Sequence, residues 1–526
     1  MFYKVLDDTD YCLDIFSIVK PENALTAESE APGRSTRTIW ITALAIAALG
    51  NGLLYDTLPG ANWPLWTTAA AACLLIFCRL RSGLRSPAIA AGAVAAVIAG
   101  GAAVTANPFM LVLIVLGVIA YLSMQMLLAA SPDWSRIRAA AAIPAPVVAF
   151  AQALVESGRR TIEAMHLVRS DRARSIIGGI AITLPVVVIF ALLLSSADPL
   201  FAEWRDTVEN LISNWDFVPR TLFFLALLAI VLGAYGLAAR GSSGIDMQGG
   251  ATTGAARQWL GVTERIILIS SVTALFTLFL LVQITYLFGN LPRITGSGIT
   301  FAEYARRGFA ELTIVASASA LLIIVSEKFG RSDRREGLIR AITIALITAI
   351  LFLLVSAFHR VSLYEEAYGF TTARLYAQAY MIVVAIGFLA LTAEVIGTID
   401  TARLFRRAAA VATTALIVLI YWNHEAWIAD SNIDRFASTG KLDVKYLVRD
   451  LSPDAVPTIV KRMAALPEPA ASEIRANLNR TYADGRQRLD GEWYEWNRGR
   501  ANAAAALRGA GIPVENRSAP HPKAYP

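Results

Sequence analysis

The stretch LIRAITIALITAILFLLVSAF at residues 338–358 decides the fold of this chain. A helix needs about 20 apolar residues to cross the hydrocarbon core of a bilayer. This run has that length and contains one charged residue, Arg340. Because lipid offers no hydrogen-bond partners, the backbone must satisfy its own N–H and C=O groups within the helix. The run therefore predicts a membrane-spanning α-helix.

Ten further runs of this kind flank it. They lie near residues 38–55, 63–80, 88–105, 108–130, 176–197, 219–239, 264–288, 308–326, 375–397 and 405–422. We therefore predict an all-α, polytopic integral membrane protein with about eleven transmembrane helices. Gly92, Gly100 and Gly101 would let a neighbouring helix approach the third run closely. Pro185 would kink the fifth run.

The composition agrees with a membrane protein. Hydrophobic residues make up 56% of the chain and charged residues 17%, whereas soluble domains carry about 25% charged residues. Three cysteines exclude a disulfide framework and a Cys-rich metal site. The net charge of +6 is explained by basic cytoplasmic loops, so the expected partner is the lipid bilayer and not nucleic acid. Acidic residues near the N-terminus, such as Asp7 and Asp14, argue against a secretory signal peptide.

Basic residues alternate between the loops. Arginines and lysines gather in loops 81–87, 131–175, 240–263, 327–337 and 398–407, whereas loops 56–62 and 106–107 have none and 198–218 has one. The two later outer loops fit the alternation less well, because one carries Arg293, Arg306 and Arg307 and the other Arg360 and Arg374. This alternation predicts that the N-terminus lies in the cytoplasm and the C-terminus outside it. The predicted parts are a polar cytoplasmic segment at 1–37, a transmembrane domain at 38–422, a small extracytoplasmic helical domain at 423–510 and a disordered tail at 511–526.

Two segments outside the predicted spans have helical patterns of their own. Residues 147–170 carry apolar side chains at helical spacing, which predicts a cytoplasmic amphipathic insert. This helix lies either on the membrane surface or packed on the helix bundle. In the C-terminal domain, Ser452-Pro453-Asp454 predicts the start of a helix that runs to about residue 465. Further helices are expected at about 470–489 and 491–509.

No strong catalytic or nucleotide-binding motif occurs in the chain. It has no phosphate-binding G-x-x-x-x-G-K-[ST] loop, no G-x-S-x-G elbow and no H-E-x-x-H pair. His359 and His424 both fall at outer ends of predicted spans, and Glu425 follows His424. Such interfacial histidines are more often polar anchors than zinc ligands, so we assign no metal and no cofactor. An enzymatic activity is not the favoured interpretation.

Charged and aromatic residues gather in three segments that the predicted topology places on the outer side. Arg307 and Glu311 are four residues apart and can pair on one helix face. The candidate outer cluster comprises Asp198, Glu303, Tyr304, Arg306, Arg307, Glu311, Glu365, Tyr368, Arg374 and Tyr376. The alternative interpretation is that these charges fasten helix ends together and the tyrosines anchor the interface. Other polar residues within spans are predicted to form interhelical hydrogen bonds, namely Asn51, Gln125, Gln283 and Glu394.

Several of these motifs resemble a known family. They are FAEYARRGFAEL at 301–312, YGFTTARLY at 368–376, SADPLF at 196–201, and GKLDVKYL with LSPDAVP at 440–457. Together they resemble a bacterial family of multi-pass membrane proteins, the domain of unknown function 4173, close to 4153. The resemblance covers roughly residues 170–510. It implies a bacterial cytoplasmic-membrane protein and no particular activity.

Three functions are compatible with the sequence. The first is transport or flipping of a small or lipid-linked substrate through the outer cluster. The second is a membrane sensor or scaffold whose outer helical domain binds a ligand or a protein partner. The third is an integral membrane enzyme acting on a cell-envelope substrate, with Glu303, Glu311 or Glu365 as acid or base.

Overall fold

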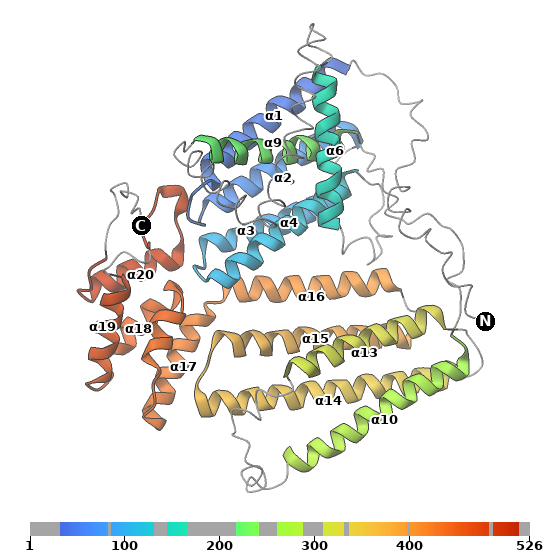
Figure 1. Ribbon diagram of the computed structural model, residues 1–526, viewed down its shortest axis with the longest axis vertical. Coiled ribbons are helices and arrows are strands. Elements are labelled where there is room, and N and C mark those ends of the chain that lie inside the picture. Colours follow the sequence, from blue (N-terminus) through green and yellow to red (C-terminus); the bar gives the residue numbers. More distant parts are fainter. Residues whose placement is uncertain are drawn as a thin grey trace, which may run out of the picture. The chain divides into compact units, whose positions relative to one another are not determined.

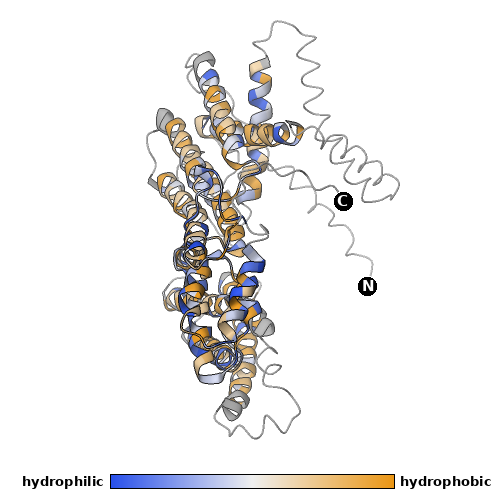
Figure 2. Cartoon of the chain, turned by 90° about the vertical axis from the view of Figure 1, so that its left-hand side faces the viewer, coloured by the Kyte–Doolittle hydropathy of each residue, from blue (hydrophilic) through white to orange (hydrophobic). Residues whose placement is uncertain are grey.

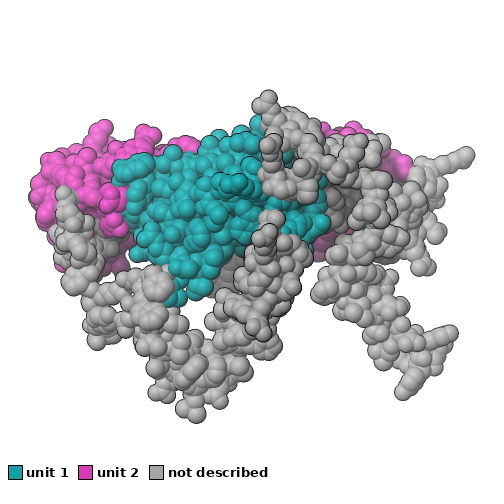
Figure 3. Space-filling model, turned by 90° about the horizontal axis from the view of Figure 1, so that it is seen from above, with its two compact units in different colours: residues 1–103, 114–247, 493–495 teal, residues 104–113, 248–492, 496–526 magenta. Residues whose placement is uncertain are grey.

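The structure is a computed structural model that describes residues 32–82, 86–130, 145–165, 217–240, 260–287, 309–330, 336–397, 400–482 and 488–514. Within these ranges the regular elements are helices, and the one isolated β-bridge joins Leu260 and Gly330. The all-α class is therefore confirmed for this part of the chain. The described residues fall into two compact units (Figure 3).

Unit 1 comprises residues 1–103, 114–247 and 493–495. Its helices are α1 (Pro32–Leu54), α2 (Asn62–Ser82), α3 (Ser86–Gly100) with the short η2 (Gly101–Ala103), the larger part of α4 (Pro108–Ala130), α6 (Ala145–Met165) and α9 (Phe217–Arg240). Helix α9 packs against α1, α2 and α6 (Figure 1). The 3₁₀ turn η5 (Trp493–Glu495) also belongs here, and Glu495 accepts a hydrogen bond from Leu58 N at 3.0 Å.

Helices α6 and α9 are in backbone contact. A Cβ on Gly233 of α9 would lie 1.8 Å from the carbonyl oxygen of Ala153, so only glycine permits this approach. The buried carboxylate of Glu156 on α6 pairs with Arg160 at 3.0 Å and with Arg240 of α9. The insert predicted at 147–170 is thus packed on a neighbouring helix. Its opposite face is apolar and open, with Val155 75% exposed.

Unit 2 comprises residues 104–113, 248–492 and 496–526. After the first residues of α4 it contains α10 (Val262–Leu287), α13 (Phe309–Phe329), α14 (Glu336–Tyr368), α15 (Thr372–Ile396) and α16 (Thr401–Tyr421). Helices α10, α13 and α15 pack on α14, and α16 packs on α15 (Figure 1). Their shared core is formed by aliphatic residues, among them Ile323, Leu346 and Leu391.

Seven described helices are long and apolar enough to cross a membrane. They span Thr36–Leu54, Pro108–Ala129, Val218–Arg240, Val262–Leu281, Glu336–Tyr368, Thr372–Ile396 and Ala402–Tyr421. Shorter apolar helices occupy Asn62–Phe77, Pro87–Ala103 and Val315–Glu327. Hydrophobic residues dominate the long helices over most of their length (Figure 2). The run predicted at 176–197, with Pro185, lies outside the described residues, so the count of about eleven spans stays a prediction.

Short helices follow α16 in unit 2. They are α17 (His424–Thr439), the π-helical turn η3 (Tyr446–Asp450), η4 (Pro453–Ala455), α18 (Val456–Met463), α19 (Ala470–Tyr482) and α20 (Arg498–Gly509). Ser452 caps η4 as predicted, because its side chain accepts a hydrogen bond from Asp454 N. The helices expected at 470–489 and 491–509 are shorter than predicted. An extracytoplasmic domain with bounds at 423–510 stays a prediction, and residues 1–31 and 515–526 lie outside the described part.

Polar residues within the spans form several of the predicted contacts between helices. Glu394 on α15 is fully buried and pairs with Arg403 at 2.7 Å and Arg407 at 2.8 Å, both on α16. Gln125 Nε2 donates to Ala71 O of α2 at 3.1 Å, and a Cβ on Gly92 would lie 2.4 Å from the same nitrogen. The predictions for Glu394, Gln125 and Gly92 are therefore confirmed. Asn51 Oδ1 is buried without a hydrogen bond to the described residues, and the Gln283 side chain lies outside them.

Candidate functional site

A buried polar network connects residues 104–107, which precede α4, to the short helices that follow α16. Asp454 lies at its centre and is 7% exposed. Its carboxylate accepts a hydrogen bond from Thr105 Oγ1 at 2.6 Å and another from Ala106 N at 3.0 Å. Asn497 Nδ2, one residue before α20, donates to Thr105 O at 2.8 Å. Segments more than 300 residues apart in the sequence are therefore held together by the carboxylate of Asp454 and the amide of Asn497.

Glu425, in the first turn of α17, is a second carboxylate of the network and is 1% exposed. It accepts hydrogen bonds from Asn107 Nδ2 at 2.7 Å, from Ser452 N at 3.1 Å and from Ser452 Oγ. The pKa of Glu425 is raised to about 7, chiefly by burial and also by the nearby Asp454, while the hydrogen bonds from Ser452 and Asn107 act in the opposite direction. Burial also raises the pKa of Asp454. Glu425 can therefore exchange a proton close to neutral pH.

His424 joins the network to α15. Its Nδ1 lies 3.2 Å from the carbonyl oxygens of both Leu419 and Trp422, which are acceptors only. These contacts assign the ring proton to Nδ1, so Nε2 accepts the hydrogen bond from Tyr376 Oη at 2.8 Å. Burial lowers the pKa of His424, which favours the neutral ring. Tyr376 in turn stacks on Phe109 with ring centroids 5.0 Å apart.

A polar cavity of about 130 Å³ opens beside this network. Thr105, His424 and Asp454 contribute to its wall, together with Tyr421, Trp422 and Arg498. The position of the Asp454 carboxylate depends on a glycine, because a Cβ on Gly499 would lie 1.7 Å from Asp454 Oδ1. The absence of a side chain at this position lets the carboxylate of Asp454 approach the first turn of α20. The arrangement offers one acidic and one basic side chain to a small polar molecule.

Three residues of the predicted outer cluster meet at the connection between α14 and α15. Glu365 accepts a hydrogen bond from Gln378 Nε2 at 2.8 Å. The Arg374 guanidinium lies 4.0 Å above the Tyr364 ring and donates to Gly369 O. Tyr368 packs on Tyr364 with ring centroids 4.8 Å apart. These contacts agree with the interpretation in which the charges fasten helix ends together.

Tyr376, by contrast, belongs to the network of His424 and Glu425. Most other members of the predicted cluster lie outside the described residues, namely Asp198, Glu303, Tyr304, Arg306 and Arg307. Glu311 lies in α13, and its side chain is outside the described part. A single outer cluster of all ten residues therefore stays a prediction.

Sequence reasoning missed most of the observed network. Asp454 and Ser452 were interpreted only as a helix start, and Glu425 only as a neighbour of His424. Thr105, Asn107 and Asn497 carried no signal, because their partners lie more than 300 residues away. Within the described ranges, no three His, Cys, Asp or Glu side chains are grouped so that they could hold a metal ion.

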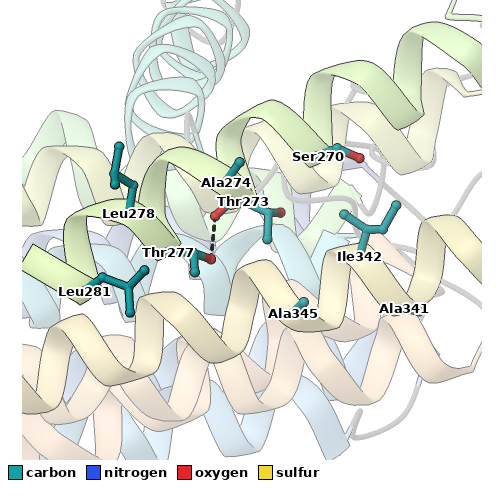
Figure 4. A pocket seen from close by; sticks show the side chains of 9 residues that line it. All are labelled: Ser270, Thr273, Ala274, Thr277, Leu278, Leu281, Ala341, Ile342 and Ala345. Atoms are coloured by element: carbon teal, nitrogen blue, oxygen red, sulfur yellow. Dashed lines mark hydrogen bonds between the residues drawn. The ribbon is translucent and has the colours of Figure 1, made fainter.

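A second cavity lies between α10 and α14 (Figure 4). It is an open groove of about 600 Å³ lined by small and aliphatic residues, including Ala274, Leu278 and Ala345. Its threonines are bonded within their own helix: Thr273 Oγ1 donates to Ile269 O and Thr277 Oγ1 to Thr273 O. The groove therefore presents an essentially apolar surface.

Long apolar helices joined by buried ion pairs and hydrogen bonds define a helical membrane protein. Within that class, residues 92–462 match the family model for a domain of unknown function, DUF4153, and the chain belongs to this family. The sequence motifs resemble the domain of unknown function 4173, close to 4153. The family model that matches the chain is that of 4153. No curated protein and no solved structure matches the chain. The matched region contains Thr105, Glu425 and Asp454 but ends before Asn497 and Arg498.

Proposed function

We propose that this protein is a membrane sensor that binds a small polar ligand in the cavity beside Asp454 and passes the signal to its spanning helices. The observation that carries the proposal is the double role of Asp454. Its carboxylate lines the cavity and also holds Thr105 and Ala106, which directly precede span α4. A ligand that binds Asp454 more tightly in one arrangement of these residues than in another would therefore favour that arrangement.

The coupling needs two states that the ligand binds with different affinity. In one state Asp454 accepts the hydrogen bonds from Thr105 and Ala106, as observed. In the other state, the ligand binds the Asp454 carboxylate in place of Thr105 or Ala106, and the start of α4 is released. Glu425 would act in parallel, because it holds Asn107 of the same segment. Asp454 and Glu425 together hold residues 105–107 by hydrogen bonds.

Hydrogen exchange of the full chain in lipid nanodiscs tests the coupling without a ligand. Asp454→Asn weakens one acceptor of the network, so exchange should increase both in 104–113 and in the first turn of α20. Asp434→Asn is the matched control, since Asp434 is an exposed carboxylate paired with Arg462. If exchange in 104–113 were the same in Asp454→Asn and in the wild type, the sensor proposal would fail.

The proposal places this cavity on the outer side of a bacterial cytoplasmic membrane, with the N-terminus inside. The alternation of basic loops supports this orientation. The exposed aromatic residues Tyr421, Trp422 and Trp427, at the end of α16 and the start of α17, also fit an interface between membrane and water. The short helices after α16 would then be open to an extracytoplasmic protein partner as well.

Cysteine labelling tests this topology. After Cys12, Cys73 and Cys78 are replaced, single cysteines at exposed Ser472 and at Gly158 of α6 report on the two predicted sides. A membrane-impermeant maleimide should label Ser472→Cys in intact cells and Gly158→Cys only after lysis. The reverse pattern would invert the orientation, and labelling of both from outside would refute the predicted span count.

Transport or flipping of a small or lipid-linked substrate is the second candidate function. The apolar groove between α10 and α14 favours it, because such a surface suits a lipid chain (Figure 4). Ala345→Trp would fill the groove and should block transport of a lipid-linked substrate. The same variant should leave ligand sensing at Asp454 intact, so a transport assay separates the two functions.

A further inference from the structure

We propose that the cavity beside Asp454 binds a small zwitterion, a molecule that carries an ammonium group and an oxyacid anion as phosphoethanolamine does. This inference rests on the proposed function, since it assigns a ligand class to the cavity that the sensor would use. The charged residues that line the cavity, the volume of the cavity and its position next to the end of a candidate span support this ligand class.

Arg498 provides the anion-binding side. It is the first residue of α20 and lines the cavity, and its exposed guanidinium forms no ion pair or hydrogen bond with the described residues. Asn502 lies four residues later, on the same helix face, and also lines the cavity. The positive end of the α20 dipole adds to the attraction for an anion. A phosphate or carboxylate group can therefore bind between Arg498 and Asn502.

Asp454 provides the cation-binding side. Its two bonded neighbours in residues 104–107 are donors, so the carboxylate has lone pairs left for an ammonium group. Tyr421 and Trp422 line the same cavity, and aromatic faces attract cations. A singly charged ligand would leave either Asp454 or Arg498 without a countercharge. A zwitterion provides a countercharge for both residues.

Size and location narrow the class further. A cavity of about 130 Å³ takes a group of a few heavy atoms and excludes a large solute. Tyr421 is the last residue of the candidate span Ala402–Tyr421, so the cavity lies next to a span end, where lipid head groups are found. The same zwitterion can therefore come from a lipid head group or from a soluble molecule.

The soluble source is tested with the full chain in phosphatidylglycerol nanodiscs, which contain no zwitterionic lipid. Phosphoethanolamine, ethanolamine and inorganic phosphate are titrated while tryptophan fluorescence is recorded. We expect phosphoethanolamine to bind at least about tenfold more tightly than either fragment, because it forms both charge-assisted contacts. Arg498→Ala should weaken its binding by about ten- to hundredfold. Arg449→Ala, at another exposed arginine, should leave the affinity unchanged.

The lipid source is tested by native mass spectrometry of the chain purified from mixed phosphatidylethanolamine and phosphatidylglycerol. Preferential retention of phosphatidylethanolamine, lost in Arg498→Ala and kept in Arg449→Ala, supports the inference and identifies the source. Binding in the soluble arm alone identifies a soluble zwitterion. Equal binding of phosphate and phosphoethanolamine, or an Arg498→Ala variant that behaves as the wild type in both arms, overturns the inference.

The two proposals fail in different ways. If zwitterion binding depends on Arg498 but Asp454→Asn leaves exchange in 104–113 unchanged, the ligand class stands and the sensing does not. If Asp454→Asn increases hydrogen exchange in 104–113 while neither the soluble nor the lipid experiment shows binding that depends on Arg498, the coupling is supported and the proposal of a zwitterionic ligand is wrong.

Discussion

Thr105 and Asp454 are separated by 349 residues in the sequence and joined by a hydrogen bond of 2.6 Å between their side chains. The bond is buried, and Asp454 accepts a second one from the neighbouring Ala106 N. A buried acceptor that loses its donor carries a desolvation cost of about 1–3 kcal/mol. Loss of the Thr105 hydroxyl should therefore lower the stability of the protein.

Thr105→Val keeps the shape of the side chain and removes the hydroxyl donor. We expect it to lower the free energy of unfolding by about 1–3 kcal/mol, since Asp454 stays buried with one donor fewer. Thermal unfolding of the full chain in detergent measures the effect. Thr277→Val is the control, because its hydroxyl is exposed and donates only to Thr273 O of the same helix. Equal effects of the two substitutions would contradict the role of Asp454.

The pKa of Glu425 predicts a dependence of stability on pH. Its folded-state pKa is raised from 4.5 to about 7, so the folded state binds this proton more tightly than the unfolded state. The resulting stabilisation is fully present below about pH 4.5 and is lost as pH rises through 7. Glu425→Gln carries no titrating group, so its unfolding temperature should lack this decrease.

The measurement is the difference in unfolding temperature between wild type and Glu425→Gln at pH values from 4.5 to 8. Asp454, whose pKa is also raised, and His424, whose pKa is lowered, titrate in both proteins and largely cancel in the difference. We expect the difference to change by a few degrees across the window. A difference that does not vary with pH would refute a raised pKa at Glu425.

Gly499 is predicted to tolerate no side chain. In Gly499→Ala the new Cβ would lie 1.7 Å from Asp454 Oδ1, so Asp454 must move away from Thr105 and Ala106. We expect a loss of about 1–3 kcal/mol in the free energy of unfolding. Gly509→Ala, in the same helix, meets nothing within 4 Å and should be neutral or stabilising by up to about 1 kcal/mol. Unfolding curves of the two variants decide between these outcomes.

In unit 1, Glu156 is predicted to hold α6 on α9. Glu156→Ala leaves Arg160 and Arg240 without their shared buried carboxylate, and a loss of about 3–5 kcal/mol is expected. Glu163→Ala removes a half-exposed partner of Arg159 and Arg160 but leaves Arg160 paired with Glu156, so it should cost no more than about 1 kcal/mol. Protease protection of α6 in the purified protein reports the result. Similar protection in both variants would show that Glu156 does not fasten the helix.

Local patterns predicted the helices well, because hydropathy over about 20 residues is a property of contiguous sequence. The run at 338–358 lies within α14 (Glu336–Tyr368), and Ser452 caps η4. The helix expected at 491–509 begins only at Arg498, because η5 and the cap residue Asn497 precede it. Helix ends depend on such single side chains more than on periodicity.

The site could not be predicted in the same way. Tyr376 was singled out for its place in a charged segment, and its partner proved to be His424. Glu365 and Arg374 were grouped with it because the predicted topology put their segment on the outer side; in the structure Glu365 bonds to Gln378, and Arg374 contacts Tyr364 and Gly369. Pairings such as Thr105 with Asp454 depend on tertiary packing, for which a single sequence gives no signal.

The hydrogen bond from Asn497 Nδ2 to Thr105 O has a consequence for biogenesis. These residues are 392 positions apart, so a ribosome adding about 5–20 residues per second needs roughly 20–80 seconds to synthesise the second after the first. During that interval α4 enters the membrane while the polar groups just before it depend on water or on an insertion factor for hydrogen bonds. This segment can therefore close only after Asn497 has been made, and a chain released before α20 is made exposes an unfinished polar end that quality-control proteases can recognise.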